Sequence, residues 1–425
     1  MKPTEFEQLA QRLRRGELPP GVTLLKQNPV RYVARADGIV LKVFLSPSVF
    51  HSPAHRAARE ARALREASAR GVPVPELLAV GRDWIATVFT AGRTAVRSDL
   101  PFILPIVDHM HRSGMLHADL HLGNLLVCGQ EVVVLDTQRA RFWPRLPRIL
   151  RHWELGRLAY SLGEPLPREL AHVSFWRELR AQQHWRSRTR RCLKESSSFT
   201  RFNRAGVRGF RRRDADPAEL AHALETLDQA ELIWPRPGGQ IYRSGAWVVK
   251  QHRSLRAARS AWIGGHGLEM RGIRTARPVA WLDRWLIMED AGPNVVEWVE
   301  ADFASSTPAE QEDMTRQLAD LLADLHRRGI YHSDLKASNV TWSPGQPTRV
   351  LDYQRVHFGI RVSRRRRTRN LAQLNAALPD VVPGRLREQA LQRYLERSGF
   401  RGQGRKLRQA VISQSLQRSH RWHGC

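Results

Sequence analysis

The sequence contains 425 residues, enough for two or more domains that each bury an apolar core. Hydrophobic residues make up 42% and charged residues 26%, as in soluble globular proteins, and no apolar run approaches the roughly 20 residues of a membrane-spanning helix. Lysine and arginine exceed the acidic residues by 28, so we expect the protein to meet something anionic, unless arginine-rich composition alone explains the excess.

The N-terminal half is predicted to begin with a helix and continue with strands. Thr4 and Glu7 form a capping-box pattern at the start of that helix. A strand-rich stretch follows and ends in the apolar segment 40–44, and an Arg/Ala-rich helix is expected over 55–67. Further short strands are expected around Trp84, before a helical C-terminal part of this half.

Two charged residues of this region are candidate site residues. Lys42 lies at the end of its apolar strand, where a long cation could reach phosphates, although a solvated lysine is the usual alternative. Glu60, on the helix that follows, is placed to pair with Lys42, but it could equally be an exposed helix residue. The stretch 29–40 contains one glycine and does not support a Gly-rich phosphate loop.

The segment 111–127, HRSGMLHADLHLGNLLV, carries the clearest chemical pattern of this half. Asp119 follows His117 by two residues and precedes Asn124 by five, which is the catalytic-loop spacing of protein-kinase-like proteins. In that pattern the aspartate accepts the proton of a hydroxyl and the asparagine binds Mg²⁺. Asp136 closes the apolar strand VVVLD, where a buried carboxylate would need a cation such as Mg²⁺.

The middle of the chain is strongly basic. Between 186 and 213 there are eleven basic residues and one acid, and in the segment 184–213 the basic residues are interleaved with tryptophan and phenylalanine. Such a segment suits an anionic membrane surface, and a solvated helix with a linker explains it equally well. Because 195–215 is rich in Ser, Gly and Arg without a clear period, we expect a domain boundary there, giving modules at 1–205 and 206–425.

The second half repeats the first in the same order. The segment HRRGIYHSDLKASNVTW (326–342) corresponds to 111–127, and similar segments flank both. Asp216 and Glu219 again precede the strands as a capping pattern. A single aspartate at such a position would usually be a turn or cap residue, but two correctly spaced copies favour a catalytic role. We therefore expect an α+β fold with two tandem bilobal modules, each with a small strand-rich lobe and a larger helical lobe.

The second half supplies its own set of candidate residues. Ala261 stands where the first half has Glu60, so the lysine of this half lacks that partner. Lys336, two residues after the catalytic-loop aspartate, could contact the transferred phosphate, whereas the first half has a histidine there. The candidates equivalent to those of the first half are Lys250, Asp334, Asn339 and Asp352.

The motifs HADLHLGN, HSDLKASN and D-x-Q-R-x-x-F resemble the bacterial lipopolysaccharide core kinases, the Kdo/heptose kinase family. The segments 234–250 and 270–281 resemble it most closely, and the resemblance covers nearly the whole chain as two family units. It implies ATP- and Mg²⁺-dependent phosphorylation of a heptose or Kdo hydroxyl of the lipopolysaccharide inner core, or of another anionic glycolipid. It also implies a cytoplasmic protein with a peripheral position on the inner membrane.

The resemblance also implies roles for individual residues. Lys42 and Lys250 would bind the phosphates of ATP; Asp119 and Asp334 would be catalytic; and Asn124, Asp136, Asn339 and Asp352 would hold Mg²⁺. Glu60, as the partner of Lys42, and Lys336 complete the candidate ATP-binding residues. Two other functions compete: a kinase for protein Ser/Thr or another small molecule, and a basic pseudokinase adaptor that binds membrane or nucleic acid. Nucleic acid is not expected, because a binding module needs none of these residues.

Overall fold

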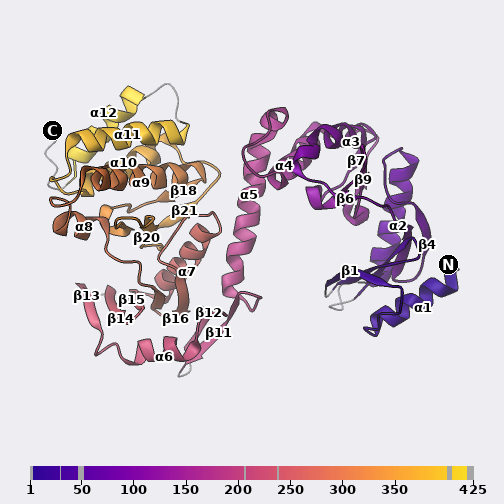
Figure 1. Cartoon of the computed structure of the whole chain (residues 1–425), viewed down its shortest axis with the longest axis horizontal. Coiled ribbons are helices and arrows are strands. Elements are labelled where there is room, and N and C mark those ends of the chain that lie inside the picture. The colour runs from indigo at the N-terminus through magenta and orange to yellow at the C-terminus, as the bar shows by residue number, and fades with distance from the viewer. Residues whose placement is uncertain are drawn as a thin grey trace. The chain divides into compact units, whose positions relative to one another are not determined.

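The computed structural model describes residues 3–28, 30–45, 52–204, 207–236, 239–399 and 404–418. The chain divides into two compact units, Met1–Ala181 (unit 1) and Gln182–Cys425 (unit 2), and the helix α5 (Ser174–Thr189) contains the division. Each unit combines helices with antiparallel sheets, which confirms the predicted α+β class (Figure 1). Among the described helices, none combines the length and the apolar character that a bilayer span requires.

Unit 1 places its sheet near the N-terminus and most of its helices after it. Its helices and strands are α1 (Pro3–Arg14), β1 (Thr23–Asn28), β2 (Arg31–Ala36), β3 (Ile39–Phe44), α2 (Pro53–Ala69), β4 (Leu77–Val80), β5 (Trp84–Val88), β6 (Arg93–Thr94), α3 (Leu100–Arg112), β7 (Met115–Leu116), β8 (Leu125–Cys128), β9 (Glu131–Val134), β10 (Arg141–Phe142) and α4 (Arg148–Ser161). Four short 3₁₀ helices join them: η1 (Arg97–Asp99), η2 (Leu122–Asn124), η3 (Thr137–Arg139) and η4 (Arg168–Val173).

Unit 2 follows a similar order and is longer at both ends. Its elements are η5 (Arg190–Leu193), β11 (Phe199–Arg204), β12 (Val207–Arg212), α6 (Pro217–Glu225), β13 (Glu231–Arg236), β14 (Gly239–Ser244), β15 (Trp247–Gln251), α7 (Leu255–Glu269), β16 (Pro278–Leu282), β17 (Trp285–Glu289), α8 (Val295–Ala301), α9 (Pro308–Arg327), β18 (Ile330–His332), η6 (Ala337–Asn339), β19 (Val340–Thr341), β20 (Arg349–Val350), β21 (Val356–Phe358), α10 (Arg364–Ala377), α11 (Gly384–Ser398) and α12 (Gly404–Leu416).

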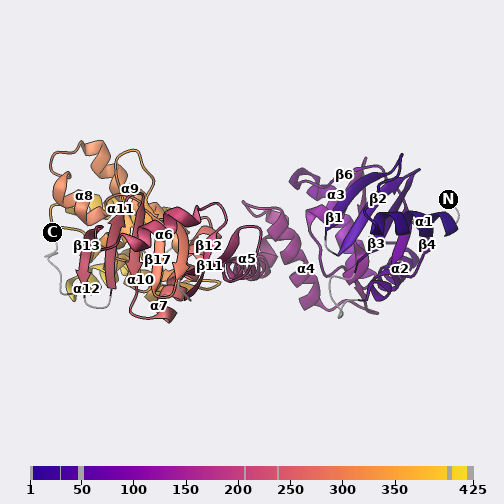
Figure 2. The same cartoon turned by 90° about the horizontal axis from the view of Figure 1, so that it is seen from below.

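The main sheets of the two units share one strand order. In unit 1 the order is β1-β2-β3-β5-β4, with α2 between β3 and β4 in the chain, and Figure 2 shows β1, β2 and β3 side by side. In unit 2 the order β13-β14-β15-β17-β16 recurs, with α7 in the same place. Lys42 lies opposite Ile85 of β5, and Lys250 lies opposite Leu286 of β17. The two lysines thus occupy matching register positions on their central strands.

The segment expected to be a linker instead forms part of unit 2. The hairpin β11–β12 extends the sheet, because β12 pairs with β16. Gly209 allows this close approach, since a Cβ there would lie 1.9 Å from the backbone oxygen of Trp281. Phe199 and Phe202 are buried, so the arginine-rich stretch has an apolar side. The expected boundary at 205/206 falls inside this hairpin, whereas the two compact units meet at 181/182.

The two predicted helix caps differ in outcome. Asp216 caps α6 as expected and accepts a hydrogen bond of 2.8 Å from the backbone N–H of Ala218. The prediction for Thr4 was wrong, because α1 already begins at Pro3 and Thr4 lies inside the helix. Glu7 accepts a hydrogen bond from Trp84 Nε1 at 2.6 Å, so it fastens α1 to the sheet instead of closing a capping box.

The catalytic-loop segments lie between short hairpins in both units. In unit 1, β7 pairs with β10 and β8 with β9; in unit 2, β18 pairs with β21 and β19 with β20. In unit 2, α9 packs against α11 in the helical part, which Figure 1 shows separate from β13–β15. These hairpins bring each catalytic loop next to the strand-ending aspartate, Asp136 or Asp352.

Candidate active sites

In unit 2 the catalytic loop is closed by a small set of hydrogen bonds. His332 Nε2 lies 2.5 Å from the backbone oxygen of Asp352, and His332 Nδ1 accepts the N–H of Asp334 at 3.2 Å. Burial lowers the pKa of His332, so its ring is neutral and the Nε2–H is the donor. These contacts give the histidine a structural role, because they fix the loop against the aspartate that ends the neighbouring strand.

Asn339 completes the loop. Its Nδ2 donates to the backbone oxygen of Asp334 at 2.8 Å, and its own backbone oxygen accepts from Leu351 N at 3.0 Å. The Oδ1 of Asn339 accepts no hydrogen bond from any residue that the structure describes. This oxygen is therefore available as a ligand for a hard cation.

Lys250 and Asp352 are paired in unit 2. The Lys250 Nζ lies 3.1 Å from Asp352 Oδ1, and the two side chains are 17% and 14% exposed. Burial acts to raise the pKa of Asp352, but the charge and hydrogen bond of Lys250 outweigh it and lower the pKa overall. Asp352 is thus an ionised carboxylate whose second oxygen has no partner among the described residues.

The remaining candidate residues of unit 2 are Lys336 and Asp334, which form a partly exposed pair. Lys336 Nζ is 3.3 Å from Asp334 Oδ1, and the lysine side chain is half exposed. Ala261 is buried in α7 and gives Lys250 no acidic partner from that position. The structure therefore forms two lysine–aspartate pairs, Lys250 with Asp352 and Lys336 with Asp334. The catalytic loop that contains Asn339 connects them in the chain.

Unit 1 builds the same loop from its own residues. His117 Nε2 lies 2.8 Å from the backbone oxygen of Leu135, and His117 Nδ1 accepts the N–H of Asp119 at 3.2 Å. Asn124 Nδ2 donates to the backbone oxygen of Asp119 at 2.9 Å, as Asn339 does in unit 2. The two loops therefore share the His–Asp and Asn–Asp hydrogen bonds. They differ in backbone conformation, because Ala118 and Asp136 have positive φ values of 63° and 57° in unit 1.

The predicted pair between Lys42 and Glu60 is present. Lys42 Nζ donates a short hydrogen bond to Glu60 Oε1, and the Glu60 side chain is only 1% exposed. The alternative of an exposed helix glutamate does not hold. The pair fastens α2 to the central strand of the sheet.

Both acids of unit 1 are paired with arginines that the sequence analysis did not single out. Arg31, on β2, makes two parallel hydrogen bonds to the Asp136 carboxylate at 3.0 and 2.9 Å. Arg157, on α4, pairs with Asp119. Burial acts to raise the pKa of Asp136, yet the hydrogen bonds from Arg31 and the charge of Lys42 hold that pKa well below its usual range.

A buried carboxylate behind the loop of unit 1 was also missed. Glu154 has no exposed surface, and its oxygens accept the N–H groups of His117 at 3.1 Å and Ala118 at 2.6 Å. His111 Nε2 lies 3.0 Å from the same carboxylate. Asn370 occupies the matching place in unit 2, 3.2 Å from His326 Nε2. The aligned segments 154–162 and 370–378 contained this signal, since each has a polar residue at its first position.

Magnesium fits the two sites unequally. In unit 2, Asp352 and Asn339 offer oxygen atoms that no described residue occupies, which is the donor chemistry Mg²⁺ prefers. In unit 1 both Asp136 oxygens are taken by Arg31, so the observed arrangement does not fit Mg²⁺. Among the described residues, no group of three or more His, Cys, Asp or Glu side chains could hold a metal ion. The predicted metal ligands of unit 2 are one aspartate and one asparagine, which do not form such a group.

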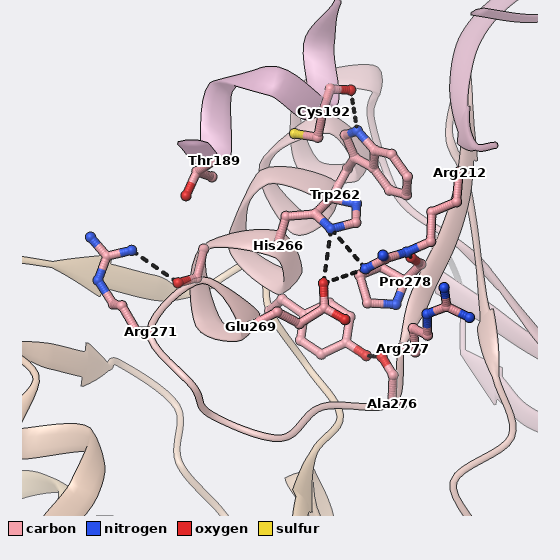
Figure 3. Close-up of polar contacts among 12 residues, drawn as sticks. Thr189, Cys192, Arg212, Trp262, His266, Glu269, Arg271, Ala276, Arg277 and Pro278 are labelled. Atoms are coloured by element: carbon pink, nitrogen blue, oxygen red, sulfur yellow. Dashed lines mark hydrogen bonds and ion pairs between the residues drawn. The ribbon is translucent and has the colours of Figure 1, made fainter. Parts of the chain in front are cut away.

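Helix α7 is held in place from the side of the added hairpin. Arg212 of β12 pairs with Glu269, which also lies 3.0 Å from His266 Nδ1 (Figure 3). Arg212 Nε donates to the backbone oxygen of Pro278 at 2.7 Å, and Trp262 Nε1 donates to the backbone oxygen of Cys192 at 2.9 Å. These contacts secure α7, which lacks the lysine–glutamate pair of α2.

Residues 286–394 match the model of the lipopolysaccharide kinase (Kdo/WaaP) family. The match lies within unit 2 and includes Asp334, Asn339 and Asp352. It confirms the predicted resemblance for this segment, and the family that it matches is a family of kinases. The second family copy predicted in unit 1 stays a prediction.

A solved structure of the bifunctional kinase-methyltransferase WbdD is also similar to the chain, at 13% sequence identity and a TM-score of 0.30. The similarity covers 42% of this chain and 47% of that one, so this chain spans less than half the length of that protein. No curated protein sequence matches the chain.

Proposed function

We propose that unit 2 transfers the γ-phosphoryl group of ATP to a sugar hydroxyl, a heptose or Kdo, of the lipopolysaccharide inner core. The observation that carries this proposal is the family match across 286–394, which contains an aspartate and an asparagine in catalytic-loop geometry beside the ionised Asp352. An ATP-dependent kinase needs few other groups, because phosphoryl transfer depends on positioning and charge neutralisation.

Each residue of unit 2 has a distinct part in this proposal. Asp334 accepts the proton of the acceptor hydroxyl, and Lys250 binds the phosphates of ATP. Asp352 and Asn339 would hold Mg²⁺, which supplies the charge neutralisation of the phosphates when it is bound. Lys336, half exposed and 3.3 Å from Asp334, is positioned to meet the phosphoryl group as it moves toward the acceptor.

In unit 1, Lys42, Glu60, Asp119, Asn124 and Asp136 form a proposed second nucleotide site. Its use with Mg²⁺ would require Arg31 to leave Asp136, because the guanidinium occupies both carboxylate oxygens. We therefore assign the transfer reaction to unit 2. The two units are proposed to be tandem kinase-like modules, since they share a sheet order and a catalytic-loop geometry.

The decisive experiment measures phosphate transfer from ATP to purified inner-core oligosaccharide by the full chain, in wild type and Asp334→Asn. The substitution removes the proton acceptor, so we expect the rate to fall by about 10²–10⁴. Addition of EDTA should stop transfer by the wild type. Transfer that persists at the wild-type rate in Asp334→Asn would refute the assignment, and transfer to protein serine in place of the oligosaccharide would favour a protein kinase.

A further inference from the structure

A pocket of unit 1 lies directly beside its catalytic loop and has no part in the proposed transfer reaction. Its volume is about 620 Å³, within the range of small-molecule binding sites. Ala118, the residue before Asp119, forms part of its wall. Three arginines and two tryptophans supply most of its remaining chemical character.

The arginines give the pocket an uncompensated positive charge. Arg59 comes from α2, Arg139 from η3 and Arg141 from β10, so three separate elements converge on one space. All three side chains are exposed, and within the described part of the chain none of them makes an ion pair. No acidic residue lines the pocket. Three guanidinium groups facing one cavity favour an anion, and they bind phosphate oxygens in a bidentate manner.

The tryptophans add a flat apolar wall. Trp153 comes from α4 and Trp176 from α5. Trp176 is fixed by close packing, because a Cβ at Gly156 would lie 2.5 Å from the Trp176 Cβ. Indole faces of this kind accept the apolar face of a ring and exclude water from it. An occupant with both a ring and a phosphate would use both parts of the wall.

The pocket is physically linked to Asp119. Arg157, which pairs with Asp119, lies with its guanidinium carbon 5.0 Å from the Trp153 ring centroid. Ala118 has a φ of 63°, and Glu154 holds this left-handed backbone by accepting its N–H. The wall of the pocket and the catalytic loop are thus one connected arrangement.

We propose that this pocket binds a phosphorylated saccharide, with the phosphate on the arginines and the sugar ring against the tryptophans. The choice of a saccharide among ring-bearing phosphates rests on the proposed function, since the product of that transfer is a sugar that carries a phosphate. Because Arg31 and Arg157 occupy the acids of unit 1, the pocket retains this ligand without transferring phosphate to it.

The test is a calorimetric titration of the full chain with glucose 6-phosphate, without ATP. Arg139→Ala and Arg141→Ala should each weaken binding about tenfold, the loss expected for one charge-assisted hydrogen bond. Trp153→Leu tests the apolar wall and should weaken binding by a similar factor. Arg62→Ala is the matched control, because this arginine is exposed on the same helix as Arg59 and does not line the pocket.

Glucose and inorganic phosphate are the other two ligands of the titration. We expect each to bind at least about tenfold more weakly than glucose 6-phosphate, because each reaches only one part of the wall. Equal binding of inorganic phosphate would overturn the saccharide assignment. Binding that Arg139→Ala and Arg141→Ala leave unchanged, or that Arg62→Ala weakens equally, would overturn the site.

The outcome is separable from the fate of the transfer reaction. Asp334→Asn should leave the titration unchanged while it abolishes transfer by unit 2. Pocket-dependent binding without any transfer by the wild type would refute the proposed function and support this site. Transfer by the wild type without pocket-dependent binding would refute this site alone.

Discussion

The strand-ending aspartates of the two units pair with different cationic side chains. In unit 1, Asp136 is held by the guanidinium of Arg31 through two hydrogen bonds, whereas in unit 2 Asp352 is held by the ammonium of Lys250 through one. A planar guanidinium matches both carboxylate oxygens, while an ammonium leaves one free. Two loops with the same His–Asp and Asn–Asp hydrogen bonds can therefore carry two electrostatic states, one closed to a metal ion and one open to it.

The helices that follow the central strands differ in a related way. In unit 1, the pair of Lys42 with the buried Glu60 holds α2 against the central strand β3. In unit 2, Arg212 and Trp262 hold α7 from the side of the added hairpin. Lys250 is thereby released from a structural pair and is available to Asp352. The added hairpin of unit 2 thus anchors α7, as the pair of Lys42 with Glu60 anchors α2 in unit 1.

The largest expected difference between the units concerns their strand-ending aspartates. Asp352→Asn removes a charge that the proposed reaction needs, so we expect transfer to inner-core oligosaccharide to fall by about 10²–10³. Asp136→Asn should change the rate less than about threefold, since Arg31 already occupies that carboxylate. Steady-state rates of the two variants check this. Equal losses would show that both units take part in transfer.

The second difference concerns stability. Lys42→Met leaves Glu60 buried without its cation, which should destabilise unit 1 by about 3–5 kcal/mol. Lys250→Met leaves Asp352, which is more exposed, and should cost about 1–3 kcal/mol. The rates of amide hydrogen exchange in β3 and β15, measured in the full chain, report the two losses of stability. The double variant Lys42→Met with Glu60→Gln should recover much of the loss; a double variant as unstable as the single one would contradict the pairing argument.

The frame of both sites was predictable from the sequence because it depends on local spacing. The distances from His332 to Asp334 and from Asp334 to Asn339 fix which backbone groups the loop can reach, and the observed hydrogen bonds follow. The pair of Lys42 with Glu60 was predictable for a similar reason, since a strand end and the next helix in the chain are close in space. The matching register of the two lysines also follows from the repeat.

The partners of the acids were not predictable in this way. Arg31 lies 105 residues from Asp136 in the chain, and only the folded sheet brings them together. Among 69 lysines and arginines, nothing local distinguishes Arg31 or Arg212 from its neighbours. The stretch 195–215 was expected to be a domain boundary because it is rich in Ser, Gly and Arg without a clear period, whereas Gly209 allows β12 to pair closely with β16. Composition describes a segment by itself, but strand pairing depends on distant residues.

The anchor of α7 predicts that the stability of unit 2 depends on pH through His266. Burial lowers the pKa of His266 to about 4, from 6.5, against the opposing effect of Glu269. Between these values the unfolded chain binds more protons than the folded chain, so stability falls as the pH is lowered, by up to about 3 kcal/mol. His266→Gln should remove this part of the loss. Urea unfolding at pH 8 and pH 4.5 measures it, and an unchanged pH dependence would exclude His266 as its source.

The smallest expected effect tests whether Arg31 closes unit 1 to magnesium. Arg31→Ala frees both oxygens of Asp136, so we expect Mg²⁺ to strengthen the binding of a non-hydrolysable ATP analogue to unit 1 by about tenfold. The titration is made in the Asp352→Asn background, which removes the metal ligand of unit 2. Arg35→Ala is the control, because Arg35 lies on the same strand but stacks on Phe89. If Mg²⁺ strengthens binding equally with Arg31 in place, the guanidinium does not exclude the ion, and unit 1 becomes a second candidate for phosphate transfer.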